Sequence, residues 1–171
     1  MPARATTYDY EQSSESGRER HIRVPYSRQT DATPILHNPV EITSLLAGGS
    51  LCGTNVTIDA VHSESVVNVA VGAVYRHGVR NCTGYGGGGA ENAWAVINIG
   101  DPVYYDPLQL GLNGDYLSIS PLGAGGAGAN SRFGIVVMQQ DEDADDFPKT
   151  DGLTPGTSVV LAVLQTGVIE S

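Results

Sequence analysis

Short apolar runs, rich in valine and separated by Gly, Pro and Asp, recur along this chain. The clearest runs are at 66–75, 100–106, 133–138 and 157–164. Runs of this length and composition between turn residues are typical of β-strands. Residues 55–61, where apolar positions alternate with other residues, and residues 94–99 are predicted strands too. The pattern predicts an all-β fold, a small β-sandwich or barrel of short antiparallel strands. The last run is apolar on both faces, which predicts a central strand.

One segment favours a helix. Residues 39–47 end at Gly48 and Gly49, a common helix stop, although the segment would span barely two turns.

The first 33 residues are polar and predict an extended N-terminal arm, followed by a β-rich domain over 34–171. A short alternation within the arm suits an edge strand added to a partner, with Pro25 restricting pairing to one side. The other interpretation is a leader without a role. On the docking interpretation, the candidate partner-binding residues of the arm are Ile22, Arg23, Val24 and Tyr26.

Charge is unevenly distributed along the chain, whose formal net charge is −10. Residues 1–30 carry a net +1 and the rest carry −11. An acidic body argues against nucleic-acid binding, which normally needs a basic face. No apolar run approaches the roughly 20 residues that cross a bilayer, and no secretory leader is visible at the start. We therefore expect a protein made in the cytoplasm that binds neither nucleic acid nor membrane.

Candidate chemistry is sparse, and we expect a protein that is not an enzyme and needs no cofactor or metal. Asp141, Asp143 and Asp145 have the spacing of an EF-hand loop, but Asp146 and Gly152 stand where Gly and Glu are required. A solvated acidic loop over 139–151 is the plainer interpretation, and a weak cation site is the alternative. The glycine run at 84–89 lacks the Lys that a phosphate loop needs, and it predicts a flexible loop or a close subunit contact.

The remaining candidates are two cysteines and three aromatic residues. Cys52 and Cys82 are expected to be free thiols, with one disulfide as the alternative. Tyr104 and Tyr105 are adjacent in one predicted strand and must face opposite sides, one in the core and one exposed or in a subunit contact. Both are candidate partner-binding residues. Trp94 is expected in the core.

Four motifs in a fixed order resemble the capsid decoration (cement or head-fibre) proteins of tailed phages. They are the valine-rich run 66–75, the Gly-Asp-Pro-Val-Tyr-Tyr-Asp segment 100–106, the Phe-Gly-Ile-Val strand 133–136 and the Pro-Gly-Thr-Ser-Val-Val-Leu strand 155–161. The resemblance covers residues 45–165. The arm, the glycine-rich loop and the acidic segment depart from the family pattern.

The resemblance implies an all-β structural protein on the outer surface of an assembled capsid. Its partners would be the major capsid protein and further copies of itself, as a homotrimer or alternatively a dimer, within a virion made in a bacterial host. A second hypothesis is a head-fibre or adhesive module that binds host carbohydrate. That module would display exposed aromatic residues near the glycine-rich loops.

Overall fold

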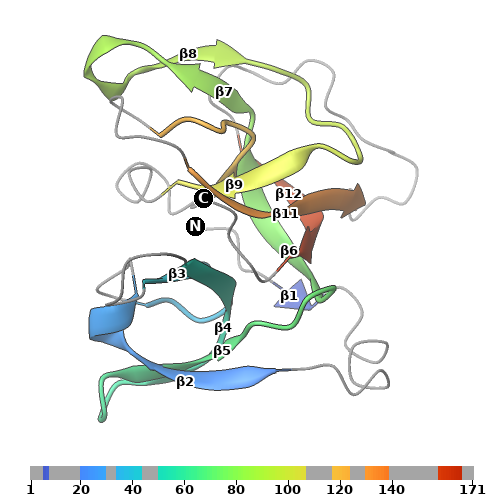
Figure 1. Ribbon diagram of the computed structural model, residues 1–171. Coiled ribbons are helices and arrows are strands. Elements are labelled where there is room, and N and C mark those ends of the chain that lie inside the picture. Colours follow the sequence, from blue (N-terminus) through green and yellow to red (C-terminus); the bar gives the residue numbers. More distant parts are fainter. Residues whose placement is uncertain are drawn as a thin grey trace.

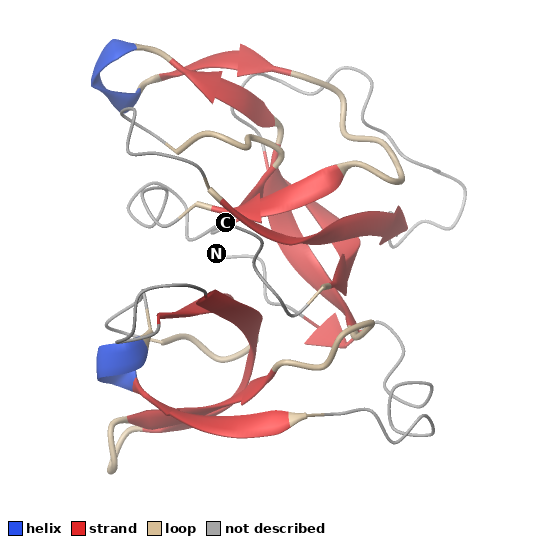
Figure 2. Cartoon of the chain, viewed as in Figure 1, coloured by secondary structure: helices blue, strands red, loops and turns tan. Residues whose placement is uncertain are grey.

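The computed structural model describes residues 6–7, 20–29, 34–43, 50–106, 117–123, 130–138 and 158–166. Figure 1 shows a curled N-terminal sheet below, a ring of strands in the middle and a hairpin above. Strands dominate the described chain, with two short 3₁₀ turns, η1 (Tyr26–Arg28) and η2 (Gly87–Gly89) (Figure 2). The predicted all-β class is confirmed. No helix in the described ranges is long and apolar enough to cross a membrane.

The N-terminal sheet has the strand order β2-β5-β4-β3. Its strands are β2 (His21–Pro25), β3 (Pro39–Thr43), β4 (Ser50–Asp59) and β5 (Glu64–Asn68), all antiparallel. The sheet curls strongly, because a bridge from Gln29 to Ile42 links the chain after β2 to β3 at the other edge. Val24, Val40 and Val67 are buried inside the curl.

Five strands form the closed ring: β6 (Val74–Arg80), β9 (Pro102–Tyr105), β10 (Leu117–Ser118), β11 (Ser131–Met138) and β12 (Ser158–Gln165). Their order is β6-β10-β9-β11-β12, and β12 pairs back with β6. The barrel alternative of the sequence prediction is therefore the observed one. The pairing of β10 with β6 is parallel, which the sequence pattern did not predict. The predicted central position of the last strand is confirmed, since β12 is paired on both sides.

The ring encloses the main hydrophobic core. One residue of the N-terminal sheet also belongs to this core. Tyr105 and Phe133 are its largest side chains, and both are fully buried. Cys52 of β4 also belongs to this cluster. Cys52 therefore links the two bodies, although the N-terminal sheet also has an apolar cluster of its own.

A separate hairpin lies outside the ring, formed by β7 (Cys82–Tyr85) and β8 (Glu91–Trp94) around η2. Gly88 has φ 80°, a left-handed conformation that glycine adopts without strain. Residues 86–89 of the predicted glycine loop thus form the turn of this hairpin, whereas Gly84 and Tyr85 belong to β7.

The predicted strand over 66–75 is wrong in one respect, because the run is broken between two bodies. It ends in β5 at Asn68 and resumes in β6 at Val74. The Asn68 side chain accepts the Ala70 N–H, and Gly72 has φ 89°. This turn chemistry carries the chain from the N-terminal sheet to the ring.

The predicted helix is also wrong, because Pro39–Thr43 is strand β3. Val40 and Ile42 both belong to the apolar cluster of the N-terminal sheet, and β4 supplies a full ladder of pairing partners. Strand pairing and burial outweighed the weak helical pattern. Residues 44–47, the rest of that prediction, lie outside the described residues.

The expected arm over 1–33 differs from the structure at its second half. Residues 20–29 belong to the body, and β2 pairs with β5 of the same chain, not with a partner. Ile22 and Val24 pack on the cluster of the N-terminal sheet, so their alternation has an intramolecular cause. Earlier in the arm, β1 (Thr6–Thr7) pairs with β6 of the ring.

Candidate functional site

Two groups of partner-binding residues were predicted from the sequence, one in the N-terminal arm and one at the two adjacent tyrosines. In the structure, some of these residues are in the core and others are exposed. Val24 is 3% exposed and Tyr105 is 0% exposed, so both are corrected here to core residues. Tyr104 is half-buried, which confirms that the two tyrosines face opposite sides. Exposed or half-buried candidates are therefore Ile22, Arg23, Tyr26 and Tyr104.

The two groups lie in different bodies and do not form one site. Ile22, Arg23 and Tyr26 belong to β2 and η1 of the N-terminal sheet, whereas Tyr104 belongs to β9 of the ring. A partner that contacts both groups must span the two bodies.

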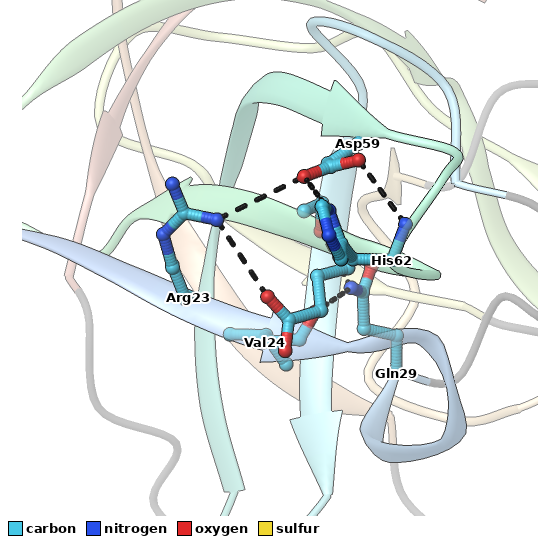
Figure 3. A network of polar contacts seen from close by, with 7 residues as sticks. Arg23, Val24, Gln29, Asp59 and His62 are labelled. Atoms are coloured by element: carbon cyan, nitrogen blue, oxygen red, sulfur yellow. Dashed lines mark hydrogen bonds and ion pairs between the residues drawn. The ribbon is translucent and has the colours of Figure 1, made fainter.

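A polar cluster surrounds Arg23 where β2 meets the turn between β4 and β5 (Figure 3). The Arg23 guanidinium lies 3.9 Å from Asp59 Oδ2 and 3.7 Å from Glu64 Oε2. His62 Nδ1 lies 2.7 Å from Asp59 Oδ2. Because a carboxylate only accepts, Nδ1 carries the proton in this bond. The hydrogen bond from His62 holds the pKa of the Asp59 carboxyl below its ordinary value.

The cluster is open to solvent, which limits what it contributes. The Arg23 side chain is 68% exposed, and the His62 side chain is 69% exposed. Exposed ion pairs contribute about 0–1 kcal/mol each. The cluster therefore holds the turn against β2 by weak contacts and leaves its charged groups exposed. Val61 at the same turn is 89% exposed. The carboxylate that His62 contacts is Asp59 of β4.

Beneath the cluster, Gln29 locks the chain that follows β2. Its Nε2 donates to the Val24 carbonyl at 3.1 Å and to Ser65 Oγ at 2.5 Å. Gln29 is 7% exposed, so these bonds are formed away from water. They hold the curl of the sheet and fix the position of Arg23 relative to β5.

A third surface, on the β7–β8 hairpin and the segment after it, was missed by sequence reasoning. Trp94, expected in the core, is 40% exposed because the hairpin stands outside the ring. Val96 and Ile99 are also exposed, while Ile97 between them is 1% exposed and occupies the ring core. The predicted strand over 94–99 is wrong beyond Trp94, because β8 ends there and only Ile97 of the remaining run is buried.

Two partly buried polar contacts attach this hairpin to the ring. Arg80 donates from Nε to Glu91 Oε1 at 2.6 Å and from Nη2 to Oε2 at 2.7 Å. Tyr85 donates from its hydroxyl to Asp106 Oδ2 at 2.5 Å. The hairpin is therefore fixed on the ring.

Neither cysteine is an exposed nucleophile. Both are buried free thiols, and Cys82 Sγ donates to the Gly84 carbonyl at 3.2 Å. Burial raises the pKa of the Cys82 thiol, which keeps it protonated at neutral pH. Within the described ranges, no three His, Cys, Asp or Glu side chains gather as metal ligands. The acidic segment 139–151 lies outside those ranges.

Comparisons with models of protein families, with curated proteins and with solved structures give no match to the chain.

Proposed function

We propose that this chain is a structural virion protein that binds the outer surface of an assembled phage capsid and stabilises the shell. The observation that carries the proposal is where the four resembling motifs lie. Three of them, at 100–106, 133–136 and 155–161, contribute to β9, β11 and β12, which are joined in the ring by the pairs β9–β11 and β11–β12. The fourth, at 66–75, is divided between β5 and the start of β6, and β6 pairs with β12. Three motifs scattered over about sixty residues of sequence thus belong to one structural unit.

Binding energetics make this role coherent. A protein that binds only the assembled lattice stabilises that lattice by mass action. An oligomer that bridges several shell subunits gains further affinity from effective concentration. We propose a homotrimer, with a dimer as the alternative, and the major capsid protein as the partner.

The proposed contact surface uses the half-buried and exposed candidates. Tyr104 offers a partly exposed aromatic ring on a rigid strand, the residue type that most often anchors protein interfaces. On the N-terminal sheet, Ile22 and Tyr26 offer apolar area beside the charge of Arg23. Because β2 already pairs with β5, this contact is made by side chains of a folded body.

The test is co-sedimentation of purified protein with expanded, undecorated capsids, followed by cryo-electron microscopy of the pelleted shells. We expect the wild-type protein to pellet at saturating stoichiometry and to appear as knobs on the shell. Tyr104→Ala should weaken binding at least tenfold, and Trp94→Ala, an exposed aromatic outside the proposed surface, should leave it unchanged. Shells that pellet without the protein and show no added density would refute the proposal.

A second candidate function is favoured by one observation. Trp94 is 40% exposed on the strand that follows the glycine-rich turn, as a carbohydrate-binding module would require. Under this alternative, Trp94→Ala would abolish binding to host surface glycans and Tyr104→Ala would not. The same two variants therefore separate the two functions.

A further inference from the structure

A buried polar network joins the N-terminal sheet to the ring. Gln165 of β12 donates from Nε2 to the carbonyls of Asn68 and Ala70, at 2.9 and 3.0 Å. Thr54 of β4 donates to Gln165 Oε1 at 3.1 Å. Asn68 Nδ2 donates to the Tyr75 hydroxyl at 2.6 Å. The backbone adds bonds from Gly72 N–H to the Gln165 carbonyl and from Gln165 N–H to the Ala73 carbonyl. We call this set of contacts the joint.

The network assigns the protons on His77, which lies in the joint. The Thr54 hydroxyl has one proton and donates it to Gln165 Oε1, so its oxygen can only accept from His77 Nε2, 3.3 Å away. His77 is therefore the neutral tautomer with the proton on Nε2. Its Nδ1 is buried without a hydrogen-bond partner.

The surroundings of His77 disfavour a positive charge on its ring. His77 is 1% exposed. The centroid of its ring lies 5.3 Å from that of Phe133, which is edge-on, and 6.0 Å from that of Tyr75. Burial lowers the pKa of His77 to about 3. A protonated ring would carry a buried charge and a second buried N–H without an acceptor, and each is costly.

Among the described strands around His77, none supplies a compensating carboxylate near the ring. Tyr75 and Cys52 are the titratable uncharged groups on the strands around His77. The charged side chains of β6 and β11 are Arg76, Arg80 and Arg132, all cationic. β12 has no charged residue, and the acids of β4 and β5 are Asp59 and Glu64, which pair with Arg23 at the distant turn.

We propose that the joint is an acid-sensitive latch, in which protonation of His77 separates the N-terminal sheet from the ring. Protonation is favoured only where the joint is open and the ring reaches water. The latch does not depend on the proposed capsid role.

The direction follows from proton linkage. The folded pKa lies below the ordinary value of 6.5, so the open state binds more protons than the closed state, by up to one, at any pH between these values. The stabilisation is complete above pH 6.5 and is lost as the pH falls towards 3. The opening equilibrium should rise by up to tenfold per pH unit, or about 30-fold between pH 7.5 and pH 5.

The test is amide hydrogen exchange by mass spectrometry at pH 7.5 and pH 5, corrected for intrinsic exchange. In the wild-type protein, we expect peptides with Gly72 and Gln165 to lose protection at pH 5, while peptides over β9 and β11 keep it. His77→Gln places a donor near Thr54 but cannot titrate, so its protection should be the same at both pH values. His62→Gln, the same change at an exposed position, should retain the wild-type response.

Two results would overturn the latch. One is an equal response to pH in the wild-type protein and His77→Gln; the other is equal loss of protection in the joint and the ring. If His77→Gln does not fold, side-chain nitrogen NMR of wild-type His77 decides. A neutral Nε2–H ring below pH 6 with the joint closed supports the latch. A midpoint near 6.5 with the joint closed refutes it.

Discussion

Gly134, in the middle of β11, has neighbours that leave no space for a side chain. A Cβ there would overlap the Leu164 carbonyl oxygen and lie 2.9 Å from Val163 Cγ1. Because the overlap is with backbone of the paired strand, Gly134→Ala should destabilise the protein by about 1–3 kcal/mol. At Gly84, a Cβ would make only ordinary contacts, with Ala93 Cβ at 3.5 Å and Asn92 Oδ1 at 3.8 Å. Urea unfolding of Gly134→Ala beside Gly84→Ala checks this, and equal stability of the two variants would contradict it.

Individual residues show what alternation can and cannot predict. Tyr104 and Tyr105 must face opposite sides of a strand, and they do. The sequence did not say which one is inside, because that depends on the curvature of a ring closed by distant strands. Trp94 was misplaced for a similar reason. Its hairpin stands outside the ring, and no second sheet in the described part of the chain covers it.

At the scale of elements, the hairpin depends on one nearly buried ion pair. The side chains of Arg80 and Glu91 are 6% and 12% exposed. Glu91→Ala removes the carboxylate that both guanidinium bonds use, so we expect a loss of about 3–5 kcal/mol in unfolding free energy. The matched control is Glu64→Ala, whose pair with Arg23 is exposed and should cost about 0–1 kcal/mol. Chemical denaturation measures both, and a Glu91→Ala cost no larger than the control would refute the assignment.

Strand positions were largely predictable from the sequence, whereas their partners were not. The runs at 100–106, 133–138 and 157–164 became β9, β11 and β12 because each carries its own pattern and turn residues. The parallel pairing of β10 and the break after Asn68 depend on contacts between distant segments. Pro39–Thr43 became a strand because β4 was available to pair with it.

For the whole molecule, we expect residues 20–29 to be indispensable, because Ile22 and Val24 of β2 belong to the apolar cluster of the N-terminal sheet. Deleting residues 1–33 removes β2, exposes the edge of β5 and opens the cluster around Val67. Because Cys52 ties this sheet to the ring core, we expect the deletion to lower the melting temperature sharply or abolish soluble expression. Deleting only residues 1–19 keeps β2 and should give a folded protein. Circular dichroism melts compare the two, and a 1–33 deletion as stable as the full chain would show that β2 is dispensable.

The described residues, taken together, carry no formal net charge. The described residues contain six arginines and six acidic side chains. The other three cations and 13 acids, which account for the net charge of −10, lie outside the described ranges. The sequence suggested a basic arm and an acidic body. The charge is instead divided between the described residues, which are neutral in sum, and the remaining residues, which carry the net charge of −10.

The closure of the ring by β12 has a consequence for biosynthesis. The N-terminal sheet is built from residues within 20–68, so its pairing partners leave the ribosome early. The ring instead waits for β12, which supplies neighbours for both β6 and β11. Until then, both strands present unpaired edges of the kind that drive aggregation. A nascent chain that stalls before residue 158 is thus expected to be half-folded, and the translation of β12 covers the open edges of β6 and β11.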